Sequence, residues 1–346
     1  MNYKLISLAL SSIMFTAQPM AAMTSDDHTH HHSGHDHTRP DSHAPIGVMG
    51  DHLMREGETM LTYRYMHMDM DGNRTGTDGV DVPLPDYMVS PTRMTMGMHM
   101  LGAMYAPSDK LTLAVMLPFT TISMDHIRNM DGLGFTTESN GIGDVKLSAL
   151  YGLYARPGRD LMLNFAISAP TGSIDERDDI PTLPTPSNAH LPYPMQLGSG
   201  TWDIIPGLTY VQWYDSWSWG LQGLYTIRTG TNDNGYTLGN KLDLSAWIAK
   251  KLAPSTSLSF RLNGLDWGNI DGADTKLLPM PTVPTKDPSL RGGTRIDALA
   301  GINFVAPGLK SLRLAAEAGV PVYQDLNGPQ LETDLVFTLG AQFTFY

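Results

Sequence analysis

Residues 110–119 read KLTLAVMLPF, and they show most clearly the pattern from which the fold is predicted. Every second residue from Leu111 to Phe119 is apolar, whereas Thr112 and Ala114 lie between them. A period of two is the spacing of side chains on one face of a β-strand. The same period returns in residues 144–153, 257–263 and 335–345. These segments are therefore predicted to be strands that each present one apolar face.

The connections between the predicted strands alternate in length. Five are short turns, at 106–109, 156–159, 214–216, 253–256 and 306–309. Six are long and polar, at about 70–91, 125–140, 171–200, 229–239, 268–293 and 321–330. Short turns at one end and long loops at the other are typical of outer-membrane barrels. Eleven connections join twelve strands, so we predict an all-β, transmembrane antiparallel β-barrel of about twelve strands over residues 58–346, with both termini periplasmic. A soluble β-sandwich shares the strand pattern but does not require the alternation of loop lengths.

Composition excludes several classes of protein. The chain has 23 Lys+Arg against 35 Asp+Glu, a net charge of −12, which excludes a general nucleic-acid binder. It has no cysteine, which excludes disulfides, thiolate metal sites and a cysteine nucleophile. No nucleophile elbow, zinc-protease helix or phosphate loop motif occurs. We therefore expect that the protein is not an enzyme.

The first 57 residues are predicted to lie outside the barrel. Residues 1–22 resemble a secretory signal peptide, with Lys4, an apolar stretch and Ala21-Ala22 before the cleavage point. Export places the protein in the outer membrane of a Gram-negative bacterium. Residues 23–57 are predicted to form a disordered, periplasmic tail. Imidazoles bind Cu(II), Ni(II) and Zn(II), so the tail is expected either to bind such ions or to be only a solvated segment. Its candidate ligands are His28, His30, His31, His32, His35, His37 and His43.

Methionine is concentrated near the N-terminus, since fifteen of the 22 lie between positions 49 and 130. A regular turn at 106–109 would align Met94, Met96, Met98, Met100 and Met104 with Leu113 and Leu117. We therefore expect most of this stripe to face lipid as hydrophobic cover, with Arg93 and His99 pointing into the lumen.

A second group of methionines accompanies histidines where strands one and three end. Thioethers favour Cu(I) and imidazoles suit Cu(II), so this group predicts a copper site at the extracellular rim. The alternative is that these methionines are flexible hydrophobic residues beside a solvated rim. The candidate ligands are Met66, His67, Met68, Met70, Met124, His126 and Met130.

Charged residues within predicted strands are expected to face the lumen, because charges that face lipid are costly. They could line a path for a polar solute, or they could form salt bridges that fill the barrel. Besides Arg93 and His99, the set comprises Asp144, Lys146, Asp243, Arg261, Asp297, Arg313, Glu317, Glu332 and Asp334.

Three stretches carry a resemblance to a known family: GIGDVKLSALY from Gly141, SAPTG from Ser168 and LGSGTWDIIPGL from Leu197. They resemble the outer-membrane barrel family of the meta-pathway of phenol degradation, whose members are described as transporters. The resemblance covers roughly residues 58–346. It implies a barrel that passes small hydrophobic or aromatic compounds.

Together these observations predict an outer-membrane channel or passive transporter for a small solute, connected with the handling of copper or another transition metal. One alternative is the channel for small hydrophobic or aromatic compounds that the resemblance implies. Another is a metal-sequestering surface protein that uses the barrel as an anchor. No cofactor is required, and copper or another transition metal is an optional bound ion. The expected partners are membrane lipid and the small-molecule or metal-ion solute, with no nucleic acid.

Overall fold

A computed structural model describes residues 39–181, 187–277, 282–309 and 311–345. In this part of the chain, strands dominate and the only helices are three short 3-10 turns. No helix among the described residues is long and apolar enough to cross a membrane. The predicted signal peptide and the tail histidines before residue 38 lie outside the described residues.

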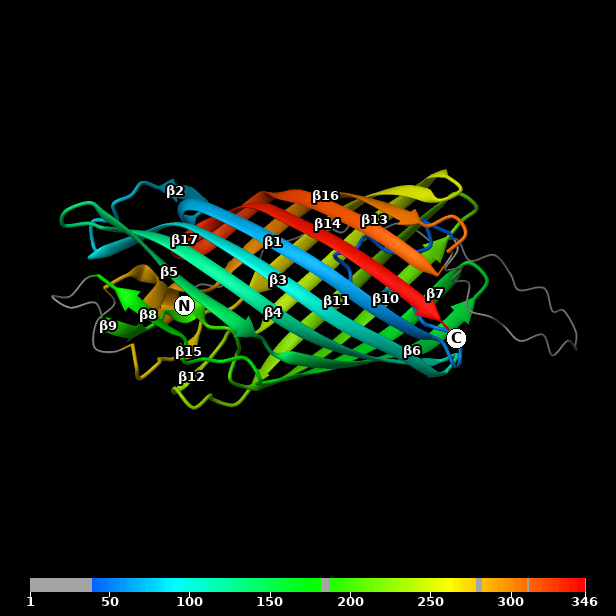
Figure 1. The fold of residues 1–346 in the computed structure, drawn as a ribbon, viewed down its shortest axis with the longest axis horizontal. Coiled ribbons are helices and arrows are strands. Elements are labelled where there is room, and N and C mark those ends of the chain that lie inside the picture. Colours follow the sequence, from blue (N-terminus) through cyan, green and yellow to red (C-terminus); the bar gives the residue numbers. More distant parts are fainter. Residues whose placement is uncertain (1–38, 182–186, 278–281, 310, 346) are drawn as a thin grey trace, which may run out of the picture. The chain divides into compact units, whose positions relative to one another are not determined.

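The strands form one closed antiparallel barrel (Figure 1). Neighbouring strands are hydrogen-bonded in chain order, and the last strand returns to pair with the first. Closure leaves no free sheet edge, as a wall in contact with lipid requires. Its strands are β1 (Thr59–Gly76), β3 (Val89–Ser108), β4 (Leu111–Arg128), β6 (Val145–Arg156), β7 (Arg159–Ala169), β10 (Trp202–Trp213), β11 (Trp217–Thr229), β13 (Lys241–Ala253), β14 (Thr256–Trp267), β16 (Gly293–Val305) and β17 (Leu312–Phe345).

The long strand β17 crosses the barrel twice. Residues 313–326 pair with β16, whereas residues 326–345 pair with β1. The backbone N–H of Thr333 donates to the side chain of Gln324, and that of Thr344 donates to the carbonyl of Ser311. These contacts require the chain to fold back on itself. Eleven labelled strands with β17 counted twice give twelve crossings in the described residues, which confirms the predicted fold class.

The two ends of the barrel differ, as predicted. Short turns join β3 to β4, β6 to β7, β10 to β11, β13 to β14 and β16 to β17, and they mark the periplasmic end. The long connections gather at the other end in Figure 1. They contain β2 (Asp78–Val80), β5 (Leu133–Ile142), β8 (Arg177–Ile180), β9 (Ser187–His190), η1 (Tyr193–Met195), β12 (Tyr236–Thr237), β15 (Asp271–Gly272), η2 (Pro284–Lys286) and η3 (Pro288–Leu290).

Two predicted loops are largely strand. β1 continues to Gly76 and pairs there with β2, so only part of 70–91 is a loop. β4 and β5 stay paired from Phe119 with Ile142 out to Arg128 with Leu133, so 125–140 is a projecting hairpin.

Alternation of burial identifies the two faces of the wall. On β4 the predicted lipid-facing residues Leu113, Val115, Leu117 and Phe119 are all exposed, whereas Thr112 is fully buried. Because exposed apolar side chains alternate with buried or polar ones around the ring, the exposed set faces lipid and the other set faces the lumen.

Residues 39–57 contradict the prediction of a disordered tail that extends to residue 57. Ile46, Leu53 and Met54 of this segment are buried. Inward side chains donate to its carbonyl groups: Trp213 to Ser42 at 2.8 Å and Gln222 to Met49 at 2.9 Å. We call residues 39–57 the plug segment, because it packs inside the barrel against the inward face of the wall. The tail prediction missed it because the histidine-rich composition ends near residue 43, and an apolar segment follows.

The methionine stripe of β3 was predicted to face lipid, but in the structure it faces the lumen. Ser108 pairs with Leu111, and if that register continued, Met104 would lie opposite Val115 on the lipid side. A bulge between Tyr105 and Ser108 shifts the register by one residue, so that Met104 pairs with Ala114. A shift of one residue moves every side chain to the other face.

Candidate functional site: the barrel lumen

One wall of the lumen is built from methionine. Cross-strand pairing places Met66 opposite Met98 and Met68 opposite Met96, with all four side chains partly exposed to the interior. We call the inward methionines of β1, β3 and β4 the methionine face. The complete set is Met60, Met66, Met68, Met70, Met94, Met96, Met98, Met100, Met104, Met116 and Met124. Flexible, polarizable thioethers make this an apolar surface that can adapt to ligands of different shape.

The methionine face is closed by a loop at its extracellular end. Met70, Met94 and Met124 form one cross-strand row and pack against Leu191 and Met195, which belong to the connection from β7 to β10. Met195 is fixed there because its carbonyl accepts a hydrogen bond from Ser139 at 2.7 Å. The long connection therefore folds inward over the methionine face.

Other inward positions carry charge. Lys241 and Asp243 lie 3.8 Å apart, and their side chains are 40% and 34% exposed although they point inward. Solvent-accessible space therefore exists inside the barrel. Arg295 pairs with Asp297 at 3.0 Å, and its Nη1 lies 3.8 Å from the sulfur of Met68, where charge meets the methionine face.

Charges nearer the periplasmic end hold the plug segment. Arg261 donates two hydrogen bonds to Glu317, at 2.9 and 2.8 Å, and Glu317 also accepts from the backbone N–H of Gly47. Arg313 donates to the carbonyl of Ala44. These predicted lumen residues therefore hold the plug segment through one buried ion pair and through hydrogen bonds to its backbone.

The three stretches that carry the family resemblance meet at Asp144. One carboxylate oxygen of Asp144 accepts from the N–H of Gly172 at 2.9 Å, and the other accepts from the N–H and hydroxyl of Ser199. A Cβ on Gly172 would lie 2.7 Å from the backbone of Leu197 and Gly198. Asp144 is thus the point where the long connection is fastened at the entry to the lumen.

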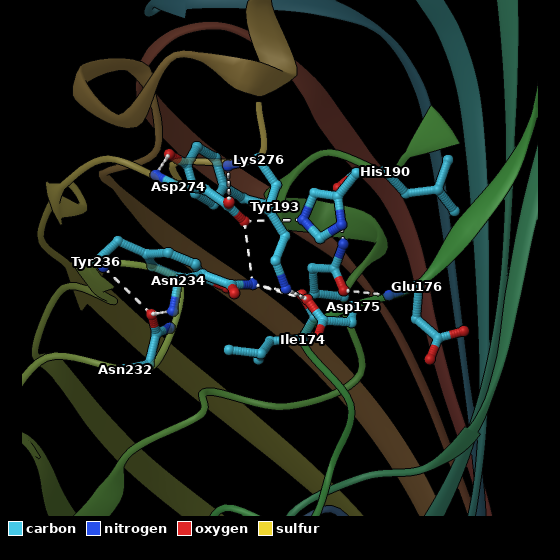
Figure 2. A network of polar contacts seen from close by, with 12 residues as sticks. Ile174, Asp175, Glu176, His190, Tyr193, Asn232, Asn234, Tyr236, Asp274 and Lys276 are labelled. Carbon is cyan, nitrogen blue, oxygen red and sulfur yellow. Dashed lines mark hydrogen bonds and ion pairs between the residues drawn. The ribbon is translucent and has the colours of Figure 1, made fainter. Parts of the chain in front are cut away.

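The described residues of three long connections form a cap, which we define as residues 170–181, 187–201, 230–240, 268–277 and 282–292. Figure 2 shows the polar network that joins them. Buried His190 lies 2.8 Å from Asp274, and Asn234 donates to Asp175 at 3.0 Å. Lys276 forms an ion pair with Asp175.

Electrostatics in the cap follow from this network. The hydrogen bond from Lys276, followed by that from Asn234, holds the pKa of Asp175 below its usual range. Burial raises the pKa of Tyr236, which packs against Tyr193 with ring centroids 4.9 Å apart. The cap is therefore a packed unit with an ionised carboxylate at its surface.

The structure divides the predicted rim ligands between the two faces of the wall. Met66, Met68, Met70 and Met124 point inward, whereas His67 lies on the outward face. His126 is buried beside Thr137 at 3.0 Å, and Met130 is 85% exposed in the β4–β5 turn. The wall separates His67 from the thioethers, so the predicted set does not converge on one point.

Four predicted lumen residues lie elsewhere. Arg93 and His99 face outward, because the bulge that points the methionines of β3 inward points the alternate residues of this strand outward. Arg93 forms an ion pair with Asp69, and His99 forms a hydrogen bond with Tyr63. Asp334 is exposed because a register shift beside Leu335 gives the inward position to Thr333. Glu332 pairs with Arg74 near the extracellular end. Lys146 and Asp243 are inward as predicted.

Comparison with known proteins agrees with this geometry. A family model described as "Putative MetA-pathway of phenol degradation" matches residues 71–277. The chain belongs to this family. It is an outer-membrane β-barrel of a Gram-negative bacterium, as predicted. A search of curated proteins finds no match.

One solved structure shows the same fold, and others are similar to a lower degree. The COG4313 outer membrane channel from Pseudomonas putida F1 has a TM-score of 0.63 at 17% identity, over 86% of this chain and 99% of that chain. The transport unit of the autotransporter AIDA-I from Escherichia coli gives 0.46 at 11% identity, over 86% and 93%. The CymD monoaromatic hydrocarbon channel gives 0.42 at 9% identity, over 85% and 90%.

Sequence reasoning missed the plug segment and most of the cap network. Asp51-His52 follow a glycine-rich turn with no periodicity, so nothing indicated that they are buried. His190 and Asp274 are far apart in the chain, and only the folded cap brings them together.

Proposed function

We propose that this protein is an outer-membrane channel for small hydrophobic compounds, including monocyclic aromatic ones. The observation that carries the proposal is the methionine face, an apolar surface inside a barrel whose other inward positions are mostly polar or charged. Sites for small apolar ligands are lined mainly by apolar groups with a few placed polar ones. Methionine also contacts aromatic rings favourably through sulfur.

In this proposal the solute moves along the methionine face, and the plug segment and the cap control its passage. Met66, Met68, Met96 and Met98 are the partly exposed members of this face, so they are the ones a solute can reach. The row Met70, Met94 and Met124 is covered by Leu191 and Met195, so the cap must move for a solute to enter from outside.

A second candidate is passage of Cu(I), because soft thioethers are its preferred ligands and pairs of them face each other across β1 and β3. Arg295, which is paired with Asp297, donates to the sulfur of Met68 and so makes that thioether less available to a cation. Copper handling is therefore the weaker proposal, and sequestration with the barrel as an anchor is weaker still, because a solvent-accessible interior is present.

The test is uptake by cells whose outer membrane contains this protein and lacks other hydrophobic-compound channels. We expect faster uptake of radiolabelled toluene, little change for arabinose, and loss of the toluene effect in Met98→Glu. The matched control Leu101→Gln changes the lipid-facing side of the same strand and is expected to keep the uptake. Faster uptake of arabinose alone would overturn the proposal, and copper accumulation without toluene uptake would favour the second candidate.

A further inference from the structure

The plug segment contains a buried cluster of metal-ligating side chains. His43, Asp51 and His52 each offer one ligating atom, and these atoms lie within 4.8 Å of one another. All three side chains are buried, with exposed fractions of 2%, 4% and 0%. Two imidazoles and a carboxylate form a donor set that suits Zn²⁺ and similar ions.

Contacts within the cluster orient these groups. Oδ1 of Asp51 lies 2.9 Å from Nδ1 of His52, and Oδ2 accepts from the N–H of Ala44 at 2.9 Å. The His43 ring meets the His52 ring edge-on with centroids 5.4 Å apart. A carboxylate that fixes the orientation of an imidazole is common around protein-bound zinc.

A fourth group, the carboxylate of Asp160 in the wall, points independently to a cation. Asp160, near the start of β7, is fully buried, and neither of its carboxylate oxygens has a hydrogen-bond partner in the described structure. It pairs with Val211, which belongs to the same apolar cluster as Leu53 of the plug segment. An isolated buried carboxylate is costly unless it is paired or binds a metal.

We infer that His43, Asp51, His52 and Asp160 bind one divalent transition-metal ion, such as Zn²⁺, which fastens the plug segment to the barrel wall. Ligands of a tetrahedral zinc ion lie about 3.4 Å apart, given bond lengths near 2.1 Å. The ligating atoms of His43, Asp51 and His52, which lie within 4.8 Å of one another, are close to this spacing. This inference concerns control of the channel, and it holds whichever solute passes through the lumen.

The experiment is titration of the purified, refolded full chain with Co²⁺, followed by visible absorption. A four-coordinate Co²⁺ ion in a site of imidazoles and carboxylates absorbs visible light far more strongly than a six-coordinate Co²⁺ ion. Co²⁺ that is bound only by flexible histidines is expected to be six-coordinate. We expect one intense, saturable band per chain that Zn²⁺ displaces. Asp160→Asn should weaken Co²⁺ binding at least tenfold, and His52→Gln should abolish the band. The matched control His67→Gln, on the outward face, should leave it unchanged.

A second measurement distinguishes a folded variant that does not bind metal from a variant that fails to fold. Resistance of the barrel to heat unfolding in detergent is compared with and without Zn²⁺. Asp160→Asn should unfold at the same or a higher temperature than the native chain without metal, because it removes an unpartnered buried charge, and it should lose the stabilisation by Zn²⁺. An intense band that persists in both His52→Gln and Asp160→Asn, or equal Zn²⁺ stabilisation of folded Asp160→Asn and native chain, would overturn the inference. Absence of an intense band in the folded native chain would do the same.

Discussion

Replacement of Glu317 by Ala tests how the plug segment is held. Glu317 is fully buried and accepts two hydrogen bonds from Arg261 and one from the N–H of Gly47. In Glu317→Ala the guanidinium of Arg261 keeps only Ser245 at 3.2 Å as a hydrogen-bond partner in the described residues. Breaking a buried pair by removing one partner costs about 3–5 kcal/mol. That corresponds to a shift of about 10²–10³·⁵ toward states in which the plug segment is released.

Two measurements can detect release of the plug segment. Single-channel recording in planar bilayers should show more frequent openings of high conductance, and amide hydrogen exchange should accelerate in residues 44–54. The double variant Arg261→Met/Glu317→Met removes both charges and should largely restore protection, because apolar replacement of a buried pair is often near neutral. The control is Asp69→Ala, which breaks the exposed ion pair with Arg93 and should change neither the conductance nor the amide exchange. Unchanged conductance and exchange in Glu317→Ala would refute the reasoning.

Two further predictions concern the cap. Asp144→Ala removes the acceptor of three hydrogen bonds from Gly172 and Ser199, so exchange protection in residues 171–181 and 187–200 should fall by about 2–4 kcal/mol. Unaltered protection would show that the connection is held by packing alone. Because Lys276 lowers the pKa of Asp175, this ion pair stabilises the cap fully at pH values above the ordinary Asp pKa of about 3.9. The stabilisation is lost as the pH falls through the lower pKa that Asp175 has in the folded protein. The exposed pair contributes at most about 1 kcal/mol. Cap exchange should therefore accelerate below pH 4 in the native chain and less in Asp175→Asn; identical pH profiles would contradict this assignment.

Strand number and barrel class could be predicted from sequence because they depend on local information. A period of two identifies each strand, and turn chemistry identifies each short connection. The outward face of β4 was also predictable, since Leu113 to Phe119 can only face lipid in such a barrel.

The orientation of β3 could not be predicted, because one bulged residue near Tyr105 decides it. Alternating methionines are apolar enough for either face, so hydrophobicity gives no preference between the two registers. The plug segment was missed for a different reason. Ile46 and Leu53 are too far apart to show a period, and their burial depends on partners such as Arg313 and Trp213 that are distant in the chain.

The most direct test of the central claim is the accessibility of Met98, because the absence of native cysteine allows single-cysteine labelling. A charged, membrane-impermeant thiosulfonate is applied to Met98→Cys and to Leu101→Cys in planar bilayers while the current is recorded. The account predicts that Met98→Cys reacts and its conductance changes, whereas Leu101→Cys, which faces lipid, does not react. Reaction at Leu101→Cys without reaction at Met98→Cys would contradict the claim that the methionine face lines the lumen.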